Sequence, residues 1–177
     1  MQIINDLAEL LIRIAMWVIF IRFWLQWANA DFYNPLAQTF VKLSDPLCKS
    51  FRAILPKNRK YDWSALLSMY LLALLRWIIY FSIIGIQYMD VNSLLLRSFF
   101  LMIDVMMMVL FFMLIIRAIA SWIVGSQHHP GLKVIIQLTE PLLMPIRRIF
   151  PPSAGMDFSP MILMLLVWLL MRIIAQI

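Results

Sequence analysis

The sequence has little charge, little glycine and almost no cysteine. Charged residues make up 14% of the 177 residues, whereas about 25% is usual in a soluble domain. Hydrophobic residues make up 64%, and a body of this size cannot bury so much apolar surface, which excludes an ordinary soluble domain. A disordered chain, polar and poor in aromatic residues, is excluded too. Cys48 is the one cysteine, so no internal disulfide can form. We therefore predict a small membrane protein with several spans.

Four apolar segments predict four transmembrane helices. They cover residues 3–27, 63–86, 94–124 and 160–174. A span needs about 20 mostly apolar residues to cross a hydrocarbon core of about 30 Å. The fourth segment is short, but its stretch MILMLLVWLLM contains no charge. The predicted fold class is an all-α membrane protein.

Each predicted span contains ionisable residues, which indicate a functional site when they lie inside a membrane. A competing interpretation is that a long side chain near a helix end reaches the interface, and we favour it for Arg22, Arg117 and Arg172. Arg76 lies in the middle of the second span, where this explanation is harder to apply. Arg76 and Asp104 are therefore the candidate intramembrane charges. The first span also contains Glu9 and Arg13.

Basic residues are concentrated in the two long connections between spans. Residues 28–62 contain six Lys or Arg and residues 125–157 contain three, whereas the short link between the second and third spans contains none before Arg97. The positive-inside rule then places both long connections in the cytoplasm and both termini in the periplasm. Such basic residues can also contact anionic lipid headgroups. The candidate lipid or partner contacts are Arg52, Lys57, Arg59, Lys60, Arg147 and Arg148.

Both long connections have apolar residues at near-helical spacing, interrupted by an S-D-P or a T-E-P step. Ser44 and Thr139 stand in these steps, where they could cap a second short helix with the following proline in its first turn. We therefore expect a helix, a break and a second helix lying in the cytoplasmic membrane interface. A re-entrant segment stays possible where the broken backbone is buried in protein. Ser64 and Ser159 are predicted to cap the second and fourth spans.

The chain matches itself at an offset of 95 residues. Eleven of the 43 positions from Arg22 to Ser64 are identical to the residue 95 positions later, and all three prolines of the first half have partners in the second. This register indicates a duplication, with repeats at residues 1–86 and 94–177. Because each repeat holds two spans, both copies insert in the same orientation, as parallel repeats about an axis along the membrane normal.

The repeat brings an arginine and an aspartate to the same side of the membrane in each half. Arg22 and Arg117 lie near the ends of the first and third spans, and Asp62 and Asp157 lie at the starts of the second and fourth. One hypothesis is an ion pair inside each hairpin, or exchanged between the two hairpins, since a charge at this depth prefers a partner. The alternative is that the aspartates only stabilise the helix starts.

Four stretches carry a further signal: IRFWLQWANADFYNP, SDPL, EPLLMPIRRIFP and GMDFSPMI. Together they resemble the bacterial YggT family of integral membrane proteins, and the resemblance covers essentially the whole chain. It implies this duplicated module and an inner-membrane location. It implies no settled activity, because relatives are associated with assembly of membrane complexes, with envelope and division organisation, and with osmotic or ion tolerance.

The sequence contains no recognisable catalytic or metal-binding constellation. His128 and His129 have no cysteine or carboxylate at ligand spacing. Cys48 has no histidine in its own repeat, and no glycine-rich phosphate loop occurs. We therefore predict that the protein is not an enzyme, needs no cofactor or metal, and binds no nucleic acid.

Two functions remain open. The first is a non-catalytic adaptor or membrane-organising factor that binds anionic lipid together with another membrane protein or a second copy of itself. The second is a small transporter or channel component for an ion or osmolyte, with Arg76, Asp104 and the arginine–aspartate pairs along its path. The fourth span is almost without polar residues, and the span interiors lack the glycine breaks of transporter helices. We therefore favour the adaptor.

Overall fold

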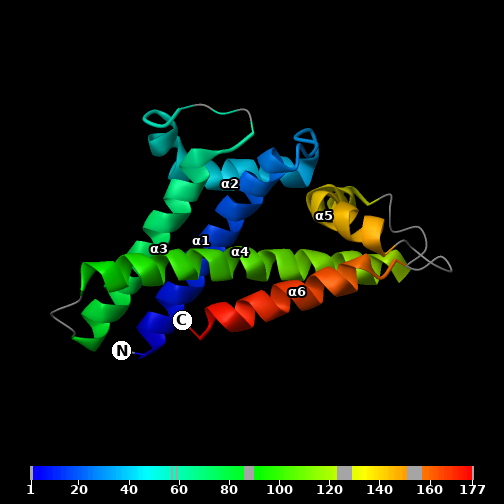
Figure 1. The fold of residues 1–177 in the computed structure, drawn as a ribbon. Helices are drawn as coiled ribbons and strands as arrows, with labels where there is room; N and C mark the ends of the chain where they lie inside the picture. The colour runs from blue at the N-terminus through cyan, green and yellow to red at the C-terminus, as the bar shows by residue number, and fades with distance from the viewer. Residues whose placement is uncertain are drawn as a thin grey trace. The chain divides into compact units, whose positions relative to one another are not determined.

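The computed structural model describes residues 2–56, 58, 60–85, 90–122, 129–150 and 157–176. These residues form six helices and no strand, which confirms the predicted all-α class (Figure 1). The helices are α1 (Gln2–Trp27), α2 (Pro35–Arg52), α3 (Trp63–Ile84), α4 (Val91–Trp122), α5 (Pro130–Ile149) and α6 (Ser159–Ile174).

The helices α1, α3, α4 and α6 occupy the four segments predicted to span a membrane. Among the described residues, Trp63–Ile84 and Val91–Ala120 are long and apolar enough to do so by length and composition. Only 22% and 28% of their most apolar stretches are buried within the chain, so most of their apolar side chains face outward, unlike those of a soluble core helix. α6 is apolar but shorter, with 16 residues, or about 24 Å at 1.5 Å per residue.

The helices α2 and α5 are each continuous, so the predicted break in the two connections is wrong. Pro46 lies inside α2, and Pro141 and Pro145 lie inside α5. A proline removes one backbone donor and crowds the preceding turn, which usually kinks or ends a helix. The sequence step that suggested two helices is therefore spanned by one helix in each connection.

Hydroxyl groups supply hydrogen bonds in the turn before Pro46 and Pro141. Ser44 Oγ donates to the carbonyl oxygens of residues 40 and 41, at 2.7 and 3.0 Å. Thr139 Oγ1 donates in the same way to those of residues 135 and 136. Ser44 and Thr139 are thus bonded back into a continuous helix, as such residues often are in helix interiors, and they are not caps of a new one.

Aspartates, not the predicted serines, supply the acceptors at the starts of α3 and α6. Asp62 is the N-cap of α3, and its Oδ1 accepts hydrogen bonds from the backbone of Ala65 and the hydroxyl of Ser64. Asp157 Oδ1 accepts from the backbone of Ser159 at 3.0 Å. The prediction of Ser64 and Ser159 as caps is therefore wrong, because the carboxylate two residues earlier makes the bond and complements the helix dipole.

Two compact units make up the chain, and their segments alternate in the sequence. Unit 1 comprises Met1–Phe23 and Phe40–Met106, and unit 2 comprises Trp24–Thr39 and Met107–Ile177. These units differ from the predicted repeats, because α4 contributes its first half to unit 1 and its second half to unit 2.

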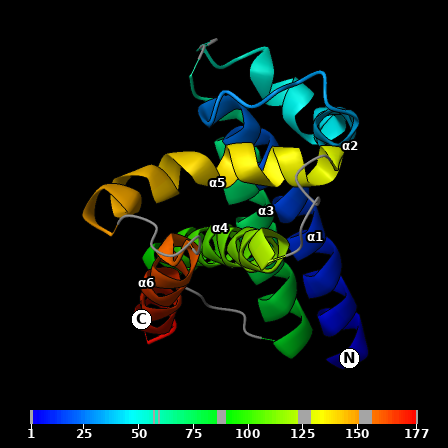
Figure 2. The same cartoon turned by 90° about the vertical axis from the view of Figure 1, so that its right-hand side faces the viewer.

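In unit 1, α1 and α3 run side by side in opposite directions (Figures 1 and 2). Two small residues of α3, Ala65 and Ala73, are fully buried. Small side chains at such positions let helix backbones approach closely, which is how helices associate when hydrocarbon surrounds them. The larger fully buried side chains of this unit include Met16, Ile19, Phe20, Met69 and Val105.

In unit 2, the second half of α4 lies beside α6 (Figure 1), and Leu114, Leu143 and Val167 form a buried cluster between α4, α5 and α6. The segment Trp24–Thr39 reaches α5, because Trp24 Nε1 donates to the carbonyl oxygen of Leu138 at 2.8 Å. The last turn of the first predicted span therefore helps to hold the second connecting helix.

Candidate functional site

Arg22 is the centre of a polar motif that joins three elements of unit 1. It lies near the end of α1 and is only 7% exposed. Its Nε donates to Asp62 Oδ2 at 3.0 Å, and its Nη1 donates to Asp45 Oδ1 at 2.8 Å and to Ser44 Oγ at 3.1 Å. We call Arg22, Ser44, Asp45 and Asp62 the first arginine motif. One guanidinium thus ties α1 to α2 and to the first turn of α3.

The first arginine motif also supports the proline-containing turn of α2. Arg22 Nη1 donates to the backbone carbonyl of Val41 at 3.2 Å, and the hydroxyl of Ser44 bonds the same oxygen. Hydrogen bonds from a charged donor are roughly twice as strong as neutral ones. A residue of α1 therefore adds hydrogen bonds to the turn just before Pro46.

The second repeat builds a similar motif around Arg117 in unit 2. Arg117 Nη1 donates to the backbone carbonyl of Ile136 and to Thr139 Oγ1, both at 2.9 Å, and its Nη2 donates to Glu140 Oε2 at 2.6 Å. These partners stand 95 residues after Val41, Ser44 and Asp45. We call Arg117, Thr139, Glu140, Arg147 and Asp157 the second arginine motif.

The two motifs differ in how the final aspartate is held. Asp157 is bound by Arg147, whose Nη2 lies 2.5 Å from its Oδ2, and Arg147 also bonds Glu140. Among the described residues, Arg117 and Asp157 form no ion pair with each other, so the expected direct pair is replaced by a bridge. Glu140 contacts both Arg117 and Arg147, as Asp45 contacts both Arg22 and Arg52, but the final aspartate is paired with the first arginine directly only in the first motif.

Hydrogen bonding also controls the acidity of Asp157. Burial would raise the pKa of this carboxyl group, but the hydrogen bonds from Arg147 and Ser159 outweigh burial and hold the pKa below its usual value. Asp157 therefore stays ionised near neutral pH, as its bridge to Arg147 requires.

We expect Asp157→Asn to lower the free energy of unfolding by about 1.5 kcal/mol, the lower end of the range for a hydrogen bond to a charged group. Adding Arg147→Gln to this variant should recover more stability than adding Arg117→Gln, because Arg147 is the residue that contacts Asp157. Thermal unfolding in detergent gives the comparison. Equal recovery by the two double variants would contradict the bridged arrangement.

The predicted lipid contacts separate into two groups. Arg52 and Arg147 lie in the arginine motifs, with Arg52 Nη2 at 3.3 Å from Asp45 Oδ1 and 3.9 Å from Asp62 Oδ2. Lys60 and Arg148 are exposed. The remaining predicted contacts, Lys57 and Arg59, lie outside the described residues.

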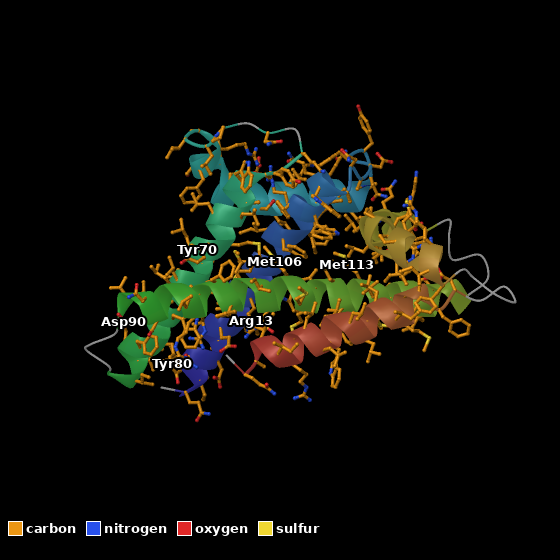
Figure 3. The ribbon with its side chains drawn as sticks, in the orientation of Figure 1. Arg13, Tyr70, Tyr80, Asp90, Met106 and Met113 are labelled. Atoms are coloured by element: carbon orange, nitrogen blue, oxygen red, sulfur yellow. The ribbon has the colours of Figure 1, made fainter. Side chains whose placement is uncertain are left out.

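A second group of charges in unit 1 joins α1, α3 and α4. Glu9 Oε1 accepts from Arg13 Nε at 2.9 Å, and Glu9 Oε2 accepts from Arg76 Nη2 at 2.5 Å. Arg13 Nη1 also donates to Asp104 Oδ2 at 3.0 Å. Figure 3 shows Arg13 where α1 passes the first half of α4. We call these four residues the charge cluster.

The charge cluster is electrically balanced, with two guanidinium groups and two carboxylates. Arg76 is 7% exposed, and its guanidinium also lies 5.3 Å from the ring centroid of Tyr80. Its Nη1 is buried and has no hydrogen-bond partner among the described residues. Sequence reasoning singled out Arg76 and Asp104 but did not connect them to Glu9 and Arg13. The i,i+4 spacing of Glu9 and Arg13 was the available signal.

Cys48 is buried in α2 within unit 1, and burial raises the pKa of its thiol. Because the thiolate is the reactive form, we expect a maleimide to modify the folded protein at least tenfold more slowly than the protein unfolded in dodecyl sulfate. The measurement is the mass shift over time at pH 7.5. Similar rates in both states would show that α2 is not packed as described.

The described residues contain no group of three or more His, Cys, Asp or Glu side chains that could hold a metal ion. His129 acts as the N-cap of α5, since its Nδ1 accepts from the backbone of Gly131 at 3.2 Å. His128 lies outside the described residues. The arginine motifs and the charge cluster thus consist of mutually paired charges, an arrangement that holds helices together.

Comparisons of the chain with a family model and with individual proteins point to the same family. The model of the CCB3/YggT family matches residues 1–83 and 96–177, two segments that begin 95 residues apart. The YggT protein of Escherichia coli K12, described as uncharacterized, is 33% identical over 177 residues, which cover 100% of this chain and 92% of that protein. An uncharacterized protein of Haemophilus influenzae is 37% identical over 150 residues, 85% of this chain and 79% of its own. No solved structure matches the chain.

Proposed function

This chain belongs to the CCB3/YggT family, and we propose that it is a non-catalytic, multi-pass protein of the bacterial inner membrane. In this proposal it acts as an adaptor or membrane-organising factor that binds anionic lipid and a membrane partner complex. The family membership confirms the resemblance seen in the sequence. It carries no activity by itself, because the relatives are described as uncharacterized.

The observation that carries the proposal is the contrast between satisfied charges and exposed apolar faces. The buried charged side chains Arg22, Asp62 and Arg76 all have ion-pair partners within the chain. The apolar helix α6, in contrast, leaves half of its side chains exposed, with Leu165 at 57% and Ile173 at 58%. Apolar faces of this extent are stable only against lipid or another apolar protein surface.

The proposed membrane arrangement has four spans, α1, α3, α4 and α6, in two repeats of the same orientation. The two matched family segments support a duplication, because their starting residues have the same offset as the sequence repeat. The connecting helix α2 supports an interfacial position. Its exposed leucines Leu36, Leu43 and Leu47 recur at helical spacing along one side. The exposed Lys42 and Lys49 lie about two turns apart along a different side.

The orientation can be tested with a reporter that fluoresces only in the cytoplasm. From the concentration of Lys and Arg in the two connections, we expect a fusion after Ile177 to be dark and a fusion after Lys60 to be bright. A bright, stable, full-length fusion at Ile177 would invert the arrangement. Immunoblotting of both fusions separates a dark reporter from a degraded one.

The adaptor role is tested by purifying the full chain from membranes in a mild detergent at native expression level. We expect a larger membrane complex to accompany it in a fixed ratio. The exposed face of α6 is tested by a variant with Leu165→Ser and Leu169→Ser. This variant should lose the complex while keeping its own thermal stability. Recovery of the chain alone, from several detergents and in the presence of a chemical cross-linker, would overturn the adaptor role.

Transport is the second candidate, and the buried Nη1 of Arg76 is the observation that favours it. A donor in the charge cluster that has no hydrogen-bond partner among the described residues is a place where water or an anion could bind. Against transport, the four charges already neutralise one another in pairs. The test is flux of K⁺ and Cl⁻ in proteoliposomes, with Arg76→Met as the comparison. Flux above that of empty vesicles, abolished by Arg76→Met, would favour transport.

A further inference from the structure

An apolar groove of about 480 Å³ lies in unit 1, where the end of the first connection meets α3 and α4. Its walls include Leu55, Trp63 and Leu67, together with Phe99 and Met102 of α4. Trp63 and Phe99 are 44% and 45% exposed, so the groove is open to the surroundings. The volume lies within the range of about 300–1,000 Å³ that is typical of small-molecule sites.

The groove offers almost no polar group to an occupant. Tyr70 also lines it (Figure 3), but its hydroxyl already donates to the carbonyl oxygen of Leu95 at 3.2 Å. Both α3 and α4 are apolar enough to cross a membrane. An occupant must therefore be largely hydrocarbon, because a polar group would lose its hydrogen bonds against these walls.

A positive charge and two aromatic rings stand next to the groove. Lys60 is exposed, and its Nζ lies 5.5 Å from the ring centroid of Tyr61. The Tyr61 ring is 5.7 Å from that of Trp63, which lines the groove. Among the described residues Lys60 has no carboxylate at ion-pair distance. The nearby carboxylate of Asp62 is bound to Arg22. Tyr and Trp are enriched where a membrane meets water, so this end of the groove is suited to a headgroup.

We propose that the groove binds one acyl chain of an anionic phospholipid, with the phosphate near the ammonium group of Lys60. This inference rests on the proposed membrane location and adds to it a defined lipid site. Hydrocarbon against Leu67, Phe99 and Met102 accounts for the apolar walls. The phosphate supplies the negative partner that Lys60 lacks among the described residues.

The test uses the full chain in phosphatidylcholine nanodiscs that contain a fixed fraction of brominated lipid, which quenches nearby tryptophan. The signal of Trp63 is the difference between the natural chain and Trp63→Phe. We expect brominated phosphatidylglycerol to quench Trp63 at least twice as strongly as brominated phosphatidylcholine. Lys60→Gln should remove this preference, while Lys49→Gln, at an exposed lysine of α2, should keep it.

A second pair of variants tests the groove itself. Leu67→Phe narrows it and should reduce quenching of Trp63 by half or more, whereas Leu75→Phe, at an exposed position two turns along the same helix, should not. Equal quenching by both lipids, or a preference that survives Lys60→Gln, would overturn the lipid site and leave the membrane location intact. Absence of quenching by either lipid would overturn both, because Trp63 would then lie away from hydrocarbon.

Discussion

Asp62→Asn is expected to lower the free energy of unfolding by about 3 kcal/mol, near the lower end of the range for breaking a buried ion pair. Arg22 and Asp62 side chains are each 9% exposed and lie 3.0 Å apart. Removing the carboxylate leaves a buried guanidinium with Asp45 as its remaining acidic partner, and Asp45 is half exposed. The amide oxygen that replaces the carboxylate can still accept at the start of α3, so the expected loss comes mainly from the ion pair.

The measurement is thermal unfolding in detergent, followed with a dye that fluoresces when it reacts with Cys48, which is buried until α2 opens. Adding Arg22→Gln to Asp62→Asn should recover part of the loss, because an uncompensated buried charge is then no longer present. Asp6→Asn is the matched control, since Asp6 is exposed on α1 and should change stability by less than about 0.5 kcal/mol. No recovery in the double variant would reduce Asp62 to a helix-capping role.

The main helices could be predicted from the sequence to within a few residues. Their apolar runs are long, and turn-forming residues end them, as Gly85 does at the end of α3 with a φ of 75°. The contact of Arg22 with Asp62 could also be proposed from the sequence, because a hairpin brings the end of one span beside the start of the next. Both inferences depend on local pattern and on connectivity, which a single sequence displays directly.

The course of α2 could not be predicted in the same way. Ser44 and Pro46 form a local pattern typical of a new helix, and the residue that overrides it, Arg22, comes from a different helix. The bridge through Arg147 was missed for a related reason. Arg52 and Arg147 are equivalent in the repeat, yet Asp62 pairs with Arg22 and Asp157 pairs with Arg147, a difference that the repeat pattern does not display.

The partners within the charge cluster could be identified only from the tertiary structure. Glu9 and Arg76 are 67 positions apart, and nothing in either local sequence identifies the other as its partner. The equivalence of Glu9 and Asp104 at the repeat offset was visible in the sequence. Their common contact with Arg13 depends on how α1 meets the first half of α4 in unit 1.

Glu9→Gln is expected to destabilise the chain by about 2 kcal/mol, less than a fully buried pair would lose, because the Glu9 side chain is 35% exposed and solvent screens part of the lost charge. Loss of the Glu9 carboxylate destabilises Arg76 more than Arg13, because the Arg76 side chain is only 9% exposed. Arg13 keeps its bond to Asp104. Adding Arg76→Met should therefore recover most of the loss, and adding Arg13→Met should recover less.

The size of this effect also discriminates between the two proposed functions. If the charge cluster is a dry structural connection, as the adaptor proposal requires, Glu9→Gln should show the full loss in the Cys48 unfolding assay. If the cluster lines a hydrated path, water can replace the lost acceptor. The loss of unfolding free energy should then fall below about 1 kcal/mol, because an ion pair exposed to solvent contributes little to stability. Arg97→Gln, at an exposed arginine over the ring of Trp77, provides a control in which both functions predict a small change. A small loss in Glu9→Gln together with ion flux in proteoliposomes would therefore favour the transporter over the adaptor.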